Sequence, residues 1–160
     1  MTAITNTINK LEAFIYRMSG YSTVYLLLFV LIGDITVSCI FSFLLFPDHS
    51  SGFQFSSLTE EFILAVLFAP IFETLIFQAL ILKKSLKYFN NNKLVAIILS
   101  ASLFGLSHYY SIPYVIKATL AGVLYGLLYF VLLNKNKQPI IYIIIVHAIY
   151  NLIGFTLNNL

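Results

Sequence analysis

The chain has very little charge. Only 9% of its 160 residues are Asp, Glu, Lys or Arg, whereas 60% are hydrophobic, and the mean hydropathy is +0.93. A soluble domain carries charge on about a quarter of its residues. So few charged side chains cannot cover a water-exposed surface of this size. The composition therefore predicts a protein whose main solvent is lipid, with one compact domain expected at this length.

Several other features are scarce. Cys39 is the only cysteine, so a disulfide within the chain is impossible, and its apolar surroundings predict a packing residue. The basic residues form no clustered face of the kind that nucleic-acid binding needs, so we expect no nucleic-acid partner. No small-x-small cleavage site ends the first apolar run, which is longer than the apolar part of a signal peptide. We therefore expect a retained first helix.

Apolar runs occupy most of the chain. A spanning helix needs about 20 mostly apolar residues, because the hydrocarbon core is about 30 Å thick. Five runs qualify, at 22–46, 62–82, 94–110, 114–133 and 139–157. The sequence predicts an all-α, polytopic bundle of about five transmembrane helices. We expect residues 1–61 to form an N-terminal segment with the first transmembrane helix and an outer loop, and residues 62–160 to form a four-helix core.

The first two runs are separated by a stretch that cannot span a membrane. Residues 47–52 combine Pro, Asp, Ser and Gly, which is typical of a turn-rich loop. Residues 53–59 are too few to cross a bilayer and could lie at its surface. Glu60 and Glu61 then enter the second helix at its N-terminal end, where the helix dipole favours negative charge.

The basic residues fall on one side of the predicted bundle. With five spans, eight of the nine share a side, and the opposite loops hold Asp48, Glu60 and Glu61 with only Lys117 as a basic residue. Because basic loops stay in the cytoplasm, we expect a cytoplasmic N-terminus and an outer C-terminus. The eight are Lys10, Arg17, Lys83, Lys84, Lys87, Lys93, Lys135 and Lys137.

A short set of polar residues lies inside the apolar runs. Each charged side chain at the centre of a bilayer costs about 2.5–3.5 kcal/mol on insertion scales, so such residues usually face the protein interior. The set consists of Asp34, Glu73, Thr74, Gln78, His108, Lys117, His147 and Asn151.

Each of these residues also has a purely structural interpretation. Glu73 could be a protonated acid that bonds a neighbouring helix, and His108 could reach water at the membrane surface. His147 and Asn151 are four residues apart, which places them on one helix face, where they could join two helices. Lys117 could extend to water from the outer end of its helix, and Asp34 could hydrogen-bond a neighbour as a neutral acid.

Taken together, Glu73, His108 and His147 favour a chemical role. Counting along the helices places Glu73 and His147 at similar depths, with His108 about two turns further out. One Glu and two His can hold zinc and leave a position for water. The same groups can also act without a metal, because a buried carboxylate can take a proton from water while His and Asn donors stabilise an oxyanion.

Three motifs in order resemble the CPBP family, the CAAX proteases and bacteriocin-processing enzymes also called Abi proteins. The family pattern is EExxxR on one helix, FxxxH on the next, and HxxxN or HxxxB on a later one. The matching segments here are 73–78, from Glu73 to Gln78, 104–108, from Phe104 to His108, and 147–151, from His147 to Asn151. The resemblance covers about residue 62 to the C-terminus and leaves the first helix outside.

The resemblance implies an intramembrane endopeptidase. Glu73 would match the residue that activates water, and His108 the histidine of the second motif. His147 and Asn151 would match the third-motif pair that polarises or stabilises the carbonyl oxygen. Members are often called metalloproteases, which implies zinc or another divalent metal held by Glu73, His108 and His147. The implied partners are membrane lipid and a peptide or membrane-protein substrate.

The chain departs from the family pattern beside Glu73. Thr74 stands where the second glutamate is expected, and Gln78 stands where the arginine is expected. An uncharged hydrogen bond between Thr74 and Gln78 could replace an ion pair without leaving a buried charge unpaired. Thr74, Gln78 and Phe104 are therefore predicted to support the site. The opposite interpretation is a degenerate member with weak or no activity.

Three functions remain open at this point. The first is a peptide-bond hydrolase that processes a leader, bacteriocin, signal or pheromone peptide. The second is a non-catalytic membrane protein with the same fold, acting in bacteriocin self-immunity or regulation. The third is a small proton-coupled transporter with Glu73 and the histidines as a relay, which would normally need a longer chain or a tight oligomer.

Overall fold

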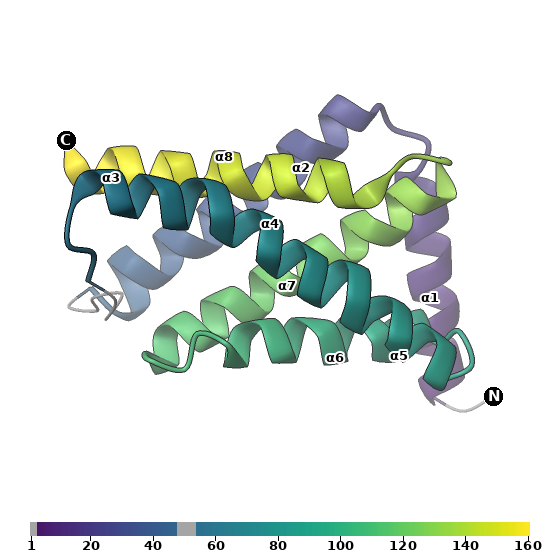
Figure 1. Ribbon diagram of the computed structural model, residues 1–160. Helices are drawn as coiled ribbons and strands as arrows, with labels where there is room; N and C mark the ends of the chain where they lie inside the picture. The colour runs from purple at the N-terminus through teal and green to yellow at the C-terminus, as the bar shows by residue number, and fades with distance from the viewer. Residues whose placement is uncertain (1–2, 48–53) are drawn as a thin grey trace.

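The computed structural model describes residues 3–47 and 54–160, and every regular element in these ranges is a helix (Figure 1). Helix α2 continues directly into η1, and α3, η2, α4, η3 and α5 follow one another without a break as one long helix. The elements are α1 (Ala3–Met18), α2 (Thr23–Cys39), η1 (Ile40–Leu45), α3 (Leu58–Glu61), η2 (Phe62–Phe68), α4 (Ala69–Glu73), η3 (Thr74–Ile81), α5 (Leu82–Tyr88), α6 (Lys93–Leu106), α7 (Ile112–Asn134) and α8 (Pro139–Asn159).

The helices confirm an all-α, multi-pass membrane protein. Four of them are long and apolar enough to cross a bilayer, namely Thr23–Leu45, Leu58–Tyr88, Ile112–Asn134 and Pro139–Asn159. Lys93–Leu106 is apolar but shorter. These five helices correspond one by one to the five predicted runs, so about five spans agree with the structure.

The third run is shorter than predicted, because α6 ends at Leu106 and not near residue 110. Two side chains compete for the Phe104 carbonyl at this end. Ser107 Oγ donates to it at 2.6 Å, and His108 Nδ1 lies 2.8 Å from it. The His108 backbone N–H bonds the Gly105 carbonyl instead. Side-chain bonds of this kind replace the regular helical ladder, so His108 lies in a turn beyond the helix.

Helix α1 was missed by the sequence analysis. It runs across one end of the bundle, at a steep angle to α6 and α8 (Figure 1). Ile15 is 2% exposed in the core, and Leu11 and Met18 pack against the same cluster. Glu12 pairs with Lys93 Nζ at 2.6 Å. Leu11, Ile15 and Met18 are four and three residues apart, which is a helical spacing. This spacing in the sequence could have predicted α1.

The basic residues gather at the end of the bundle where α1 lies. The α5–α6 and α7–α8 connections reach that end, whereas α3, the α6–α7 turn and the C-terminus lie at the other (Figure 1). Lys135 Nζ donates to the Ser19 and Tyr21 carbonyls there, at 2.8 and 2.9 Å. The charge segregation agrees with the predicted topology. Which end faces the cytoplasm stays a prediction.

The region between the first two spans is described only in part. Residues 48–53 lie outside the described residues, so most of the predicted loop at 47–52, including Asp48, is not described. The long helix begins at Leu58 with Ser57 as its cap, because Ser57 Oγ accepts from the Glu60 N–H at 3.1 Å. Glu60 Oε2 accepts from the Ser56 N–H at 2.7 Å. The acidic residues therefore stabilise the N-terminal end of this helix.

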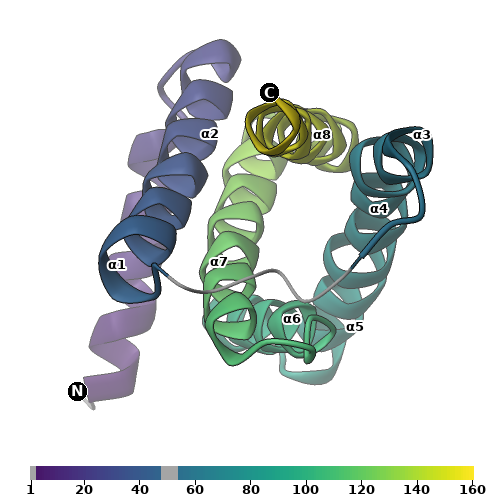
Figure 2. The same ribbon diagram turned by 90° about the vertical axis from the view of Figure 1, so that its left-hand side faces the viewer.

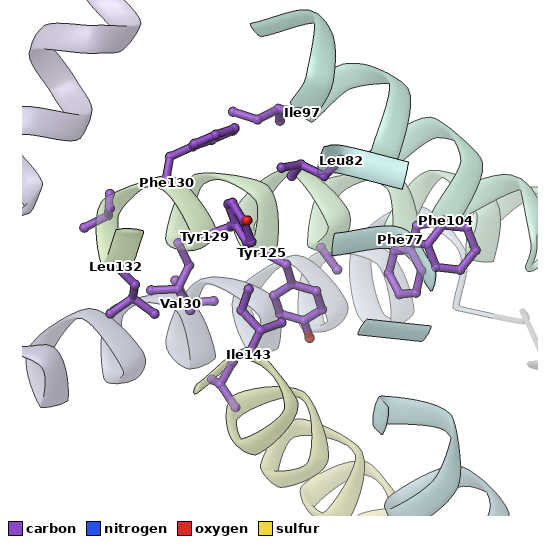
Figure 3. Close-up of a cluster of buried hydrophobic side chains, with 14 of the residues drawn as sticks. Val30, Phe77, Leu82, Ile97, Phe104, Tyr125, Tyr129, Phe130, Leu132 and Ile143 are labelled. Carbon is purple, nitrogen blue, oxygen red and sulfur yellow. The ribbon is translucent and has the colours of Figure 1, made fainter. Parts of the chain in front are cut away.

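Seen along the bundle, α6, α7, α8 and the long helix 58–88 surround an interior, with α2 packed outside beside α7 and α8 (Figure 2). The apolar core fills the half of this interior nearer the basic end, with Leu82, Leu132 and Ile143 fully buried (Figure 3). Cys39 is exposed on α2, which corrects its predicted packing role. Toward the other end of the bundle, polar side chains line a cavity.

Helices α6 and α7 approach very closely, because glycines lie where they cross. A Cβ atom at Gly122 would lie 2.9 Å from the Ala101 Cα atom, and one at Gly105 would lie 2.7 Å from the Val115 carbonyl oxygen. Small residues at such crossings let helices in lipid gain van der Waals contact. This close contact fixes the position of the turn that carries His108.

We predict that Gly122→Ala and Gly105→Ala each lower the free energy of unfolding by about 1–3 kcal/mol, because the added methyl group must push two helices apart. Gly154→Ala is the matched control, since its Cβ would meet nothing within 4 Å. That change should be neutral or slightly stabilising, because alanine favours a helix. Thermal unfolding in detergent measures all three. Equal stability of the Gly122 and Gly154 variants would contradict the packing.

Candidate active site

Six of the eight polar residues found in the apolar runs line one cavity of about 440 Å³, namely Asp34, Glu73, His108, Lys117, His147 and Asn151. Its deep part contains Glu73, His108 and His147, and it extends past Glu61 and Asn158 toward the end of the bundle that holds the C-terminus. This is the end opposite the basic one. A water-accessible path therefore leads from one end of the bundle to the buried carboxyl group.

Glu73 lies between the two histidines. Its Oε2 atom is 3.6 Å from His147 Nε2, and its Oε1 atom is 3.8 Å from His108 Nε2. The side chains are largely buried, with exposed fractions of 25% for Glu73, 11% for His108 and 6% for His147. The predicted convergence of these three residues is thus present in the structure. The two-turn offset expected for His108 does not separate them, since the turn after α6 brings its imidazole to the carboxylate.

The proton on His108 can be assigned from its surroundings. Nδ1 lies 2.8 Å from the Phe104 carbonyl oxygen, which can only accept a hydrogen bond. Nδ1 therefore carries a proton, and Nε2 of the neutral ring presents its lone pair to Glu73. The Phe104 residue of the second motif thus holds the histidine through its backbone.

Aromatic rings enclose both imidazoles. The Phe104 ring meets His108 edge-on at 5.0 Å between centroids, and it meets His147 edge-on at 6.0 Å. Tyr114 packs against His108 at 4.9 Å, and Tyr125 packs against His147 at 5.1 Å. Figure 3 shows Phe104 beside Phe77 of the long helix. The centroids of these two rings lie 5.3 Å apart. Phe104 therefore contacts both imidazoles, and its supporting role in the reaction stays a prediction.

Asn151 bonds a backbone group that the helix register leaves free. In the π-helical segment η2 the Ala69 N–H bonds the Leu64 carbonyl, five residues earlier. The same register would pair the Ala65 carbonyl with residue 70, which is proline and has no N–H. Asn151 Nδ2 donates to the Ala65 carbonyl oxygen at 2.7 Å. One amide hydrogen therefore joins α8 to the long helix, and a contact with substrate stays a prediction.

Thr74 and Gln78 are 0% and 1% exposed, and the hydrogen bond predicted between them is absent. Within the described part of the chain, Thr74 Oγ1 and Gln78 Nε2 have no hydrogen-bond partner. Both residues belong to the π-helical segment η3 (Thr74–Ile81). The predicted hydrogen bond between Thr74 and Gln78 is therefore wrong.

Three further residues line the cavity, and the sequence analysis had singled out two of them, Asp34 and Lys117, but not Tyr125. Asp34 is 1% exposed and accepts a hydrogen bond from Tyr125 Oη at 2.6 Å, so the expected bond to a neighbour is confirmed. Lys117 lines the cavity, with Nζ 4.2 Å from the centre of the Tyr114 ring. Its extension to water stays a prediction. Tyrosines are frequent in this sequence, so position alone did not single out Tyr125.

The side chains at the centre are of the types that zinc accepts, namely two neutral imidazoles and one carboxylate. The carbonyl bond of His108 Nδ1 is also usual for a metal-binding histidine. Over residues 3–47 and 54–160, however, no three His, Cys, Asp or Glu side chains are arranged as a metal cluster. A metal held by Glu73, His108 and His147 stays a prediction.

Fold and site together define a multi-pass membrane protein with a Glu–His–His centre and an asparagine on the same inner face. A family model described as type II CAAX prenyl endopeptidase Rce1-like matches residues 55–153. The match covers more than half of the chain, so the protein belongs to this family of membrane proteases, which is the CPBP family. No curated protein and no solved structure matches the chain. Helices α1 and α2 lie outside the matched residues, and the predicted division at residue 61 stays a prediction.

We predict that Thr74→Val leaves the free energy of unfolding unchanged or raises it by about 1 kcal/mol, because it removes a buried hydroxyl without a partner. Ser100→Ala is the contrasting variant, since Ser100 Oγ is equally buried but donates to the Phe77 carbonyl at 2.8 Å. It should lose about 1 kcal/mol. Equal losses in the two variants, measured by unfolding in detergent, would show that the Thr74 hydroxyl is bonded.

Proposed function

We propose that the protein is an intramembrane endopeptidase that hydrolyses a peptide bond of a membrane-associated protein or peptide, with Glu73 activating the attacking water. The observation that carries this proposal is the Glu73 carboxylate, which faces two imidazole Nε2 atoms in a cavity that opens at one end of the bundle. Membership of a membrane protease family supports the same reaction class.

The reaction can be written with these residues alone. A water beside Glu73 attacks the carbonyl carbon of the scissile bond and gives its proton to the carboxylate. Negative charge develops on the carbonyl oxygen, which a donor N–H of His147 or Asn151 would stabilise. When the tetrahedral intermediate collapses, the carbon–nitrogen bond breaks and the proton on Glu73 passes to the leaving amine. Once Glu73 carries the proton, its carboxyl group could donate a hydrogen bond to the Nε2 lone pair of His108, which would orient that proton for transfer.

A divalent metal is the alternative way to activate the same water. Glu73, His108 and His147 would hold it, and it would polarise the carbonyl group as a Lewis acid. The metal content of the purified protein, compared with that of His147→Ala, separates the two routes. Stoichiometric metal that is lost in the variant supports the metal route. Full activity after treatment with a chelator supports the glutamate acting alone.

The substrate proposal is less specific. The matched family model is described in terms of prenyl endopeptidases, and the mixed polar and apolar lining of the cavity does not by itself specify the substrate. We propose a peptide or membrane protein that enters from the cavity end of the bundle, for example a leader, bacteriocin or signal peptide. On the predicted topology that end faces outward.

A non-catalytic role in bacteriocin self-immunity or regulation is the second candidate, favoured by the uncharged Thr74 and Gln78 in place of the family's charged pair. Under this candidate, Glu73→Gln would keep the immunity phenotype of the wild type. The same substitution removes the phenotype if it depends on peptide cleavage.

We predict that Glu73→Gln lowers peptide cleavage by at least about 100-fold, and that His108→Ala and His147→Ala do so to a similar extent, because each removes a group from the centre. The assay uses fluorogenic peptides with the protein in proteoliposomes. Cys39→Ala, on the exposed face of α2, is the control that should cleave like the wild type. Cleavage by Glu73→Gln at the wild-type rate would rule out the proposed enzyme.

A further inference from the structure

Helix α2 contributes a residue to the cavity although it lies outside the matched residues 55–153. That residue is Asp34, which is 1% exposed in the middle of an otherwise apolar helix. A carboxyl group at this position is costly in a membrane, and an apolar residue would pack α2 against α7 without that cost. The position of Asp34 therefore suggests a role beyond packing.

Among the residues that the structure describes, the hydrogen-bond partner of the Asp34 side chain is the phenol of Tyr125 on α7. Tyr125 Oη donates to Asp34 Oδ2 at 2.6 Å, and the Tyr125 side chain is itself 1% exposed. Asp34 Oδ1 has no partner within the described residues. The Tyr125 hydroxyl is thus the group that Asp34 holds, and the buried pair fixes the direction of the tyrosine ring.

The Tyr125 ring in turn forms one wall for His147. The two rings lie 5.1 Å apart between centroids with an interplanar angle of 36°, and Phe104 meets the imidazole edge-on on another side. Figure 3 shows Tyr125 beside Ile143, one turn before His147 on α8, and close to Val30 of α2. The chain of contacts therefore runs from Asp34 through Tyr125 to the imidazole.

The two histidines differ in how they are oriented. His108 is held by a hydrogen bond from Nδ1 to the Phe104 carbonyl. For His147, no hydrogen bond to the ring is formed by any of the residues that the structure describes, and the imidazole lies against Glu73 and two aromatic rings. An imidazole placed only by ring contacts depends on the rigidity of those rings. Tyr125 is rigid because its hydroxyl is held by Asp34.

We propose that Asp34 is a positioning residue of the active site, which holds Tyr125 against His147 and so fixes the direction of the imidazole toward Glu73. The proposal rests on the proposed function, because it assigns Asp34 a part in the same reaction. It also gives α2 a role in that reaction, since without this helix the Tyr125 hydroxyl has no acceptor. Asp34 acts through Tyr125 and does not itself touch the substrate.

A purely structural role of Asp34 predicts a change in stability without a change in rate. A bond that only fastens α2 to α7 would change stability, while the site of the folded protein would keep its rate. Ser38, one turn beyond Asp34, also joins α2 to a tyrosine, because its hydroxyl contacts that of Tyr150 on α8. Helix α2 therefore has a second polar attachment, which should keep it in place when the Asp34 bond is lost.

The test compares Asp34→Leu, Asp34→Asn and Tyr125→Phe with Thr36→Val, a control on the exposed face of the same helix. We expect Asp34→Leu and Tyr125→Phe each to lower kcat about tenfold with KM within about twofold of the wild type, because a misdirected group affects the chemical step more than binding. The double variant should be no slower than either single one, since both remove the same contact. Asp34→Asn keeps an oxygen acceptor and should recover at least half of kcat.

A second measurement does not depend on activity. With isotopically labelled histidine in detergent micelles, the ring resonances of His147 should move in Asp34→Leu and Tyr125→Phe, and should stay in Thr36→Val. If the wild type cleaves nothing, the proposed function fails, while these resonances still report whether Asp34 orients His147. Unchanged His147 resonances in folded Asp34→Leu or Tyr125→Phe protein would overturn the proposal, and so would strictly additive losses of kcat.

Discussion

A carboxyl group cannot face lipid, and this constraint organises the long helix 58–88. On this helix Phe72 and Leu75, which are close to Glu73 in sequence, are 55% and 45% exposed on the outer surface. Glu73 itself turns into the cavity. Once Glu73 faces inward, water and polar partners must reach it, because a buried charge without either is too costly. His147 on α8 and His108 beyond α6 supply the partners, and the cavity supplies the path for water. The ring of helices surrounds this one group.

The register of the long helix is part of the same arrangement. Two π-helical segments flank the short α4 that ends in Glu73. In the first, the wider register and Pro70 together free the Ala65 carbonyl, which Asn151 then satisfies. Bulges of this kind are frequent at functional sites. In this protein the first segment is hydrogen-bonded to α8, the helix of His147, through Asn151.

The fold was largely predictable from the sequence, because hydrophobic length is a local property that the membrane imposes on each span. Five apolar runs gave five helices, and the segregation of basic residues was visible before any packing was known. Helix α1 was missed because it does not span, and its apolar spacing is mixed with charged residues. The end of α6 at Leu106 was missed because it depends on hydrogen bonds. The side chains of Ser107 and His108 both bond the Phe104 carbonyl, and a count of apolar residues cannot detect such bonds.

The candidate site was predictable where it depends on motifs, and not where it depends on contacts between distant residues. Spacing and family resemblance selected Glu73, His108 and His147, and the structure brings them together. The bond between Asp34 and Tyr125 joins residues on separate helices, so no local pattern could reveal it. The expected bond between Thr74 and Gln78 was wrong, because spacing shows that two residues share a helix face and does not show that their polar atoms meet.

The most direct test of the central claim is cleavage of a peptide in ¹⁸O-labelled water, followed by mass spectrometry of the fragments. If Glu73 activates water for peptide hydrolysis, the wild type releases a fragment whose new C-terminal carboxyl group carries ¹⁸O. Glu73→Gln then releases almost none over the same time. Labelled fragment formed equally fast by Glu73→Gln would contradict the assignment of the buried carboxyl group as the base.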